Sequence, residues 1–298
     1  MYYKLIQLFI LILTFNSTHS YATYPELTAK EYSEWYPLRM NRSTMPEVEH
    51  SSFEQLLSEM TFSSSANILS VGAGTGNMEA IWGPKINKRI PLKRFDAIEP
   101  NPCHLQPLQA VMNTMSEHIE GLQSKIYETS IEDFWSHKPT ERYDMIFLTH
   151  VIHWFQDPTQ HLQRLQKLLK PHGNIFIVIH SEEGVPRLYH EHSQRVAGDH
   201  FGNLNLTAES LSQKLSAHGT NHLIRKFPAT LDITEVLNGK PTGLKVLSFL
   251  FARNLLKISK KDFSCICNSL KSYVLSDRID QQEGVKISEP VTWIMIPR

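Results

Sequence analysis

The chain has 298 residues with 30 basic and 30 acidic side chains, so its formal net charge at neutral pH is zero. The length allows one large domain with its own core, and the balanced charge excludes the basic surface that a nucleic-acid partner needs. The 15 histidines are scattered rather than spaced as metal ligands. Three cysteines, Cys103, Cys265 and Cys267, give no disulfide framework. We expect a monomer that takes a small-molecule partner and no metal.

Residues 1–22 carry the features of a secretory signal peptide. Lys4 precedes the apolar run Leu5–Phe15, and Ser20-Tyr-Ala22 forms a small-x-small cleavage site. The apolar run is too short to cross about 30 Å of hydrocarbon, so we expect no stable membrane anchor. The N-terminus thus predicts an exported protein, periplasmic or secreted.

Residues 23–62 have helical spacing over Lys30–Tyr36 and Glu47–Met60, with Asn41–Thr44 and Pro46 interrupting the pattern. We expect this N-terminal helical cap to lie over the mouth of a ligand site. Its aromatic side chains either line a substrate pocket or pack the helices together, because aromatic residues also dominate ordinary cores. They are Tyr32, Trp35 and Tyr36.

The stretch Asn67–Glu79 organises the rest of the chain. The mostly apolar run Ile68–Val71 predicts a buried parallel strand, and Gly72, Gly74 and Gly76 end it sharply before a helical segment. Glycines suit a tight turn with positive φ and let a ligand approach the backbone without a Cβ in the way. The helix behind them offers free N–H groups at its start.

A second predicted strand ends in Glu99, about 20 residues past the glycines, where an α/β nucleoside site places an acid on the ribose hydroxyls. The G-x-G-x-G spacing is one residue shorter than the dinucleotide pattern G-x-G-x-x-G. S-adenosyl-L-methionine therefore fits better than NAD. Because this compound is a cytosolic metabolite, a cytoplasmic protein is the alternative to an exported one.

Strand and helix patterns alternate from Asn67 onward, which predicts a Rossmann-like, doubly wound parallel sheet with its loop tips at one edge. The glycine turn, Glu99, Ser130 and Thr149 follow the first four strands and should converge on one nucleoside at that edge. Expected strands are Asn67–Val71, Arg94–Ile98, Ser124–Glu128, Tyr143–Thr149 and Asn174–Ile179, and expected helices are Asn77–Trp82, His104–Gly121 and Pro158–Leu169.

The pattern changes after His180. A capped helix is predicted from Thr207 to His218, a strand over residues 223–233, and helices over residues 243–256 and 262–275. The apolar run Pro290–Ile296 predicts a last strand that returns antiparallel. We expect an α/β domain over residues 63–298, with seven strands and a C-terminal helical insertion.

These motifs together resemble those of class I S-adenosyl-L-methionine-dependent methyltransferases. The resemblance rests on Val71–Gly76, Glu99, Tyr143–Pro158 and Leu168–Gly173. It implies an enzyme that moves a methyl group from S-adenosyl-L-methionine to an acceptor, with residues 63–298 as the methyltransferase domain.

A narrower resemblance is to the histamine N-methyltransferase group of small-molecule methyltransferases. In Ile68–Gly74, Ser70 stands where most class I enzymes carry an acid, and further similar segments lie along the chain. The likeness implies that Gly72, Glu99, His104, Ser130 and Thr149 lie at cofactor-binding positions. The further segments are Met40–Thr44, Glu99-Pro100, Glu128–Ser130, Thr207 through Leu231–Thr234, and the closing strand.

Two departures from that group concern the substrate. The acid that holds the substrate amine in the histamine enzyme falls at Met45, which cannot pair with a cation, and its asparagine falls at Glu289 or Pro290. A carboxylate at Glu289 would therefore stand across the site from its usual position. Histamine itself is disfavoured as the acceptor, and we expect another small amine or imidazole compound.

Methyl transfer from a sulfonium needs no acid for its leaving group, so alignment of the acceptor and exclusion of water supply much of the catalysis. An acceptor that carries a proton needs a base, and His150 or His153 is a candidate at neutral pH. Alternatively, both are ordinary loop residues. The sequence thus favours a small-molecule N-methyltransferase, with a non-catalytic or protein-modifying exported protein of the same fold as the alternative.

Overall fold

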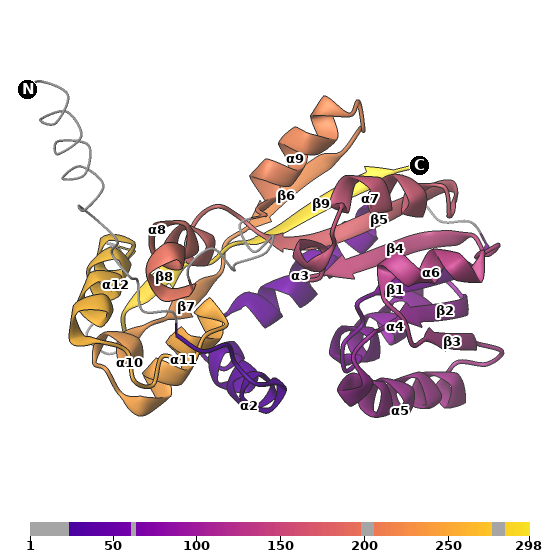
Figure 1. Cartoon of the computed structure of the whole chain (residues 1–298). Helices are drawn as coiled ribbons and strands as arrows, with labels where there is room; N and C mark the ends of the chain where they lie inside the picture. The colour runs from indigo at the N-terminus through magenta and orange to yellow at the C-terminus, as the bar shows by residue number, and fades with distance from the viewer. Residues whose placement is uncertain (1–23, 61–63, 198–205, 276–283) are drawn as a thin grey trace, which may run out of the picture.

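The computed structural model describes residues 24–60, 64–197, 206–275 and 284–298, so the predicted signal peptide lies outside the described residues. A seven-stranded sheet forms the centre of the molecule (Figure 1). Its strands are β1 (Ala66–Val71), β2 (Leu92–Ile98), β3 (Gln123–Tyr127), β4 (Tyr143–Thr149), β5 (Leu169–His180), β6 (Leu223–Phe227) and β9 (Val291–Pro297). They lie side by side in the order β3-β2-β1-β4-β5-β9-β6.

Strands β1 to β5 pair parallel with one another, and β9 pairs antiparallel with both β5 and β6. The predicted Rossmann-like sheet with an antiparallel last strand is thereby confirmed. The strand predicted over residues 223–233 is in fact two, β6 and β7 (Thr230–Asp232), and β7 pairs with β8 (Lys286–Ser288) in a separate ribbon. Pro228 lies between them and has no N–H to continue a ladder.

Helices cover both faces of the sheet because successive strand residues point to opposite sides. Ile68 and Phe147 face one hydrophobic cluster, while their neighbours Leu69 and Leu148 face another. The first face carries α3 (Met45–Glu59), α4 (Asn77–Arg89) and α5 (Pro102–His118); the second carries α6 (Ile131–Phe134), α7 (Pro158–Gln166) and α9 (Ala208–Ala217).

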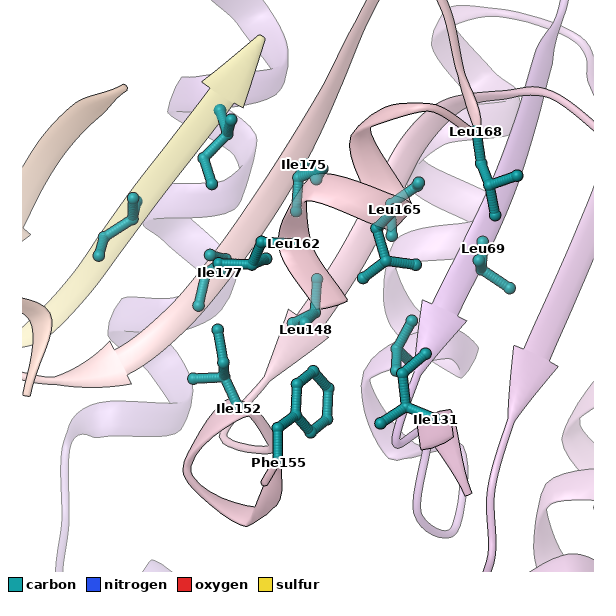
Figure 2. Packing of buried hydrophobic residues seen from close by; sticks show 14 of the residues in the cluster. Leu69, Ile131, Leu148, Ile152, Phe155, Leu162, Leu165, Leu168, Ile175 and Ile177 are labelled. Carbon is teal, nitrogen blue, oxygen red and sulfur yellow. The ribbon is translucent and has the colours of Figure 1, made fainter. Parts of the chain in front are cut away.

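Helix α7 shows how the local sequence sets the packing. Asp157 caps it by accepting a hydrogen bond from the Gln160 N–H at 2.9 Å, and Pro158 occupies its first turn. Leu162 and Leu165 then point onto the sheet, in the cluster that Figure 2 shows with Ile175 and Ile177 of β5. The helix ends at Gln166, and Leu169 already belongs to β5.

A third hydrophobic core lies at one end of the sheet, where β5 ends and β9 begins (Figure 1). This core combines α2 from the N-terminal part of the chain with helices from its C-terminal half. We call this group the cap. It consists of α2 (Ala29–Met40), α8 (Val185–Ala197), α10 (Thr234–Leu237), α11 (Pro241–Phe251), α12 (Lys260–Ser272) and the β7–β8 ribbon.

The N-terminal helices predicted as one cap lie in different layers. Helix α2 packs on α11, where Tyr32 and Tyr36 contact Phe249 with ring centroids 4.8 and 5.7 Å apart. Helix α3 instead buries Phe53 against the sheet. Over the described ranges, no helix is both long and apolar enough to cross a bilayer, and no group of three potential metal ligands occurs.

Candidate functional site

The glycine turn lies at the carboxyl edge of the sheet, between β1 and α4. Gly72, Gly74 and Gly76 all have positive φ, at 68°, 58° and 83°. A Cβ on Gly72 would overlap the side chain of Val151, which follows β4, whereas a Cβ on Gly74 would meet nothing within 4 Å. Packing therefore explains Gly72, and Gly74 leaves open space in front of the backbone for a ligand.

Glu99 lies directly behind Gly74 with 4 % of its surface exposed. Its Oε2 accepts a hydrogen bond from the Gly74 N–H at 2.7 Å, and its Oε1 accepts one from the Asn101 N–H at 2.9 Å. His104 approaches the same carboxylate, with Nδ1 3.4 Å from Oε1. Two backbone amides thus fix the carboxylate at the end of β2, and each oxygen keeps a lone pair for another donor.

Ser130 and Thr149 complete this edge by their positions in the strands. Thr149 ends β4, one residue after the Leu148 that pairs with Val71. Ser130 directly precedes α6, and its Oγ accepts a hydrogen bond from the Asp133 N–H at 3.1 Å. Both residues therefore follow strands of the parallel sheet, and the Ser130 hydroxyl caps a helix.

A buried acid beneath the glycine turn escaped the sequence reasoning. Glu79, in the first turn of α4, accepts a hydrogen bond from Ser70 Oγ at 2.6 Å. Its Oε2 is buried without a hydrogen-bond partner among the described residues. Burial, together with the nearby Glu99 carboxylate, raises the pKa of Glu79 to about 7. An acid in the first turn after a glycine turn, nine residues from Ser70, was the available signal.

His150 lies at the same edge, just after β4, in an unusual backbone conformation. Its φ is +52°, which costs free energy for a residue other than glycine. Its Nε2 lies 2.5 Å from Oε1 of Glu49 on α3, and its ring lies against His180 with centroids 5.0 Å apart. The Nδ1 atom is buried without a hydrogen-bond partner within the described part of the chain.

His153, the other candidate base, lies in the same loop beside the exposed Trp154. Burial, and to a smaller degree the neighbouring His150, lowers the pKa of His153 to about 3. A histidine this reluctant to take a proton is a poor general base at neutral pH. His150 is therefore the better placed of the two.

Met45 and Glu289, the predicted substrate residues, come together around Arg39. The Met45 sulfur lies 3.8 Å from Arg39 Nη2, and Glu289 Oε1 lies 2.5 Å from the same nitrogen. Ser43 Oγ donates to the other carboxylate oxygen of Glu289 at 2.6 Å. Glu289 and Arg39 are both buried, at 2 % and 3 % exposure, so this carboxylate is already neutralised by its own chain.

Comparison with protein families decides the assignment. Residues 44–223, more than half of the chain, match the family model described as "Methyltransferase domain". The chain belongs to this methyltransferase family. The family uses S-adenosyl-L-methionine, which confirms the cofactor predicted from the glycine turn and Glu99. A comparison with curated protein sequences finds no match.

Solved structures confirm the methyltransferase fold. The YcgJ protein from Bacillus subtilis is similar with a TM-score of 0.51 at 13 % identity, covering 84 % of this chain and 98 % of that one. Protein BH2331 from Bacillus halodurans C-125 has a TM-score of 0.53 at 14 % identity, covering 83 % and 97 %. At these identities the likeness concerns the fold, and the acceptor must be inferred from this methyltransferase's own residues.

The methyltransferase carries two buried charged residues, close to the predicted substrate residues, that the sequence did not single out. Glu49 lies one helical turn after Met45 on the same side of α3, and both are buried. Arg39 lies in the last turn of α2. Their partners, His150 and Glu289, are 101 and 250 residues away, so no local pattern links them.

Proposed function

We propose that this protein transfers a methyl group from S-adenosyl-L-methionine to a nitrogen of a small amine or imidazole compound. One observation carries this proposal: two features lie at the same edge of the sheet. They are the glycine turn with Glu99 behind it and the acid–imidazole pair Glu49–His150. The first fits a nucleoside and the second fits a nitrogen acceptor that must lose a proton.

On the cofactor side, we assign the ribose hydroxyls to Glu99, whose carboxylate is held by two backbone amides. The open space before Gly74 supports close approach of the cofactor to the backbone, and Gly72 and Gly76 shape the turn. His104, Ser130 and Thr149 border the same edge and complete the proposed cofactor contacts.

When bound, S-adenosyl-L-methionine supplies an electrophilic methyl group on a positively charged sulfur. The chain's own residues then have to hold the acceptor nitrogen in line and exclude water. We place the acceptor beside Met45 and Glu289, which are both buried, with Glu289 acting through Arg39 rather than as a free carboxylate. The likeness to the histamine N-methyltransferase group supports a small nitrogen compound in the same place.

The predicted signal peptide over residues 1–22 supports export of the enzyme, with residues 23–298 released as the mature chain, which we propose acts as a monomer. A cytoplasmic enzyme is the alternative. Fractionation of cells expressing the full chain, with N-terminal sequencing of the product, separates the two: cleavage after Ala22 in the exported fraction supports export.

Calorimetric titration of the full chain with S-adenosyl-L-methionine and S-adenosylhomocysteine tests the cofactor site. We expect micromolar binding that Glu99→Ala abolishes and that Glu117→Ala, an exposed acid on α5, leaves intact. Transfer of a labelled methyl group to histamine, imidazole and 2-phenylethylamine then tests the acceptor class. Cofactor binding with methylation of proteins but of no small nitrogen compound would establish the protein-modifying alternative, and binding without any transfer the non-catalytic one.

A further inference from the structure

We infer that Glu49 is a positioning residue that holds His150 so that its Nδ1 atom takes the proton lost by the acceptor nitrogen. This inference rests on the proposed function and deepens it, since it restricts the acceptor to a group with an N–H proton to give up. It adds one residue, Glu49, that no sequence motif marks.

The geometry fixes which nitrogen of His150 is free. Nε2 faces the Glu49 carboxylate at 2.5 Å, and because a carboxylate only accepts hydrogen bonds, Nε2 must carry a proton. In the neutral ring Nδ1 is then the lone-pair atom, and it has no hydrogen-bond partner among the described residues. A buried acceptor without a donor costs free energy, which a functional partner would recover.

Backbone contacts hold the ring in place. The His150 N–H donates to the carbonyl of Val178 in β5 at 2.9 Å, so its backbone remains bonded to β5 although it lies beyond β4 and its φ is positive. Glu49 is 3 % exposed on its side chain and His150 is 24 % exposed, so the pair is largely sheltered, and an acceptor has to displace the groups that cover Nδ1 in order to reach it. Strain of this kind persists where the surroundings over-determine the conformation.

Among the charged groups near this pair, Glu49 is the one whose charge is directed at the His150 ring. Arg39 is neutralised by Glu289. Burial lowers the pKa of His180 well below its ordinary value and that of His153 to about 3, so both rings are neutral at pH 7. The carboxylate of Glu49 therefore stabilises the imidazolium that forms when His150 accepts a proton.

The proton and electron balance is simple. The acceptor reacts from its protonated, ammonium-type form, which loses one N–H proton to Nδ1 of His150, and the freed lone pair forms the new N–C bond. The C–S bond breaks as this bond forms, and its electron pair stays on sulfur, which becomes neutral. His150 afterwards returns the proton to solvent, so that one proton is released for each methyl group transferred and the methylated product leaves as a cation.

Nitrogen-15 spectra of the labelled full chain test the positioning role directly, with His150→Gln used to assign the signals. We expect a His150 ring protonated at Nε2 and unprotonated at Nδ1. Glu49→Gln should remove this preference, because an amide can also donate. Glu132→Gln is the matched control, since Glu132 of α6 lies 3.7 Å from His161 of α7, away from His150. A His150 tautomer that does not respond to Glu49→Gln overturns the inference.

Kinetics on a methylated compound from the panel provide the second test. Glu49→Gln should lower kcat about tenfold to hundredfold with little change in KM. A change in KM alone, with kcat unchanged, overturns the inference. Failure of the whole panel contradicts the amine acceptor, and the tautomer result then decides the role of Glu49.

Discussion

The sheet edge and the region near the cap differ in the kind of group that each presents: the first uses backbone amides and the second uses side chains. At the sheet edge the proposed cofactor contacts come from backbone amides and turns, such as the Gly74 N–H that holds Glu99. Near the cap, side chains from remote segments form a buried ion pair, Arg39–Glu289, and a carboxylate–imidazole pair, Glu49–His150. A shared cofactor can be bound by a conserved backbone shape of the fold, whereas an acceptor is selected by side chains that vary without altering the sheet.

Breaking the Arg39–Glu289 pair should have the largest effect. Arg39→Met leaves the Glu289 carboxylate buried with only Ser43 as a partner, which we expect to lower the free energy of unfolding by about 3–5 kcal/mol. Urea denaturation measures the loss. Adding Glu289→Gln should restore part of it, and Arg225→Met, which breaks a more exposed pair with Glu59, should have a much smaller effect. An equal loss in both single variants would contradict a special role for this contact.

On the sheet side, Glu79 should make stability depend on pH. Its folded pKa of about 7 lies above the 4.5 of the unfolded chain, so the folded state holds the proton more tightly and stability falls as pH rises from 5 to 8. At about 1.4 kcal/mol per pKa unit, the difference of about 2.5 between the folded and unfolded pKa corresponds to a loss of roughly 3 kcal/mol. Glu79→Gln should remove this slope in urea titrations at a series of pH values. A slope identical to that of the wild type would assign the dependence to other groups.

Substitutions in the glycine turn can separate an effect on stability from an effect on cofactor binding. Gly74→Ala should cost about 1 kcal/mol because of its positive φ, and the added methyl group should weaken cofactor binding about tenfold by entering the ligand's approach. Gly121→Ala is the matched control, since Gly121 also has positive φ and open space but lies in the loop before β3. Calorimetry that finds equal cofactor affinity in both variants would contradict this account of Gly74.

Trp154 should have the smallest effect on stability. It is 61 % exposed in the loop after β4, so Trp154→Ala should change the free energy of unfolding by less than about 0.5 kcal/mol. Thermal unfolding of both proteins checks this. A loss of several degrees in Tm would show that the loop is anchored through this ring.

The sequence revealed the sheet well because its evidence is local. The glycine turn, the apolar strands and the acid at Glu99 lie within short segments with recognisable periods. Helix α8 was missed because its apolar residues, such as Leu188, pack in the cap core against segments far along the chain. Arg39 and Glu49 were missed for the same reason, since their charge is explained only by partners that the fold brings close.

The position of β9 has a consequence for how the protein is made. This strand lies inside the sheet, between β5 and β6, yet it consists of residues 291–297. Until these residues have been synthesised, β5 and β6 lack the strand that joins them, and Arg39 lacks its partner 250 residues further along the chain. A sheet that is completed this late leaves strand edges unpaired during synthesis, and unpaired edges are prone to aggregation.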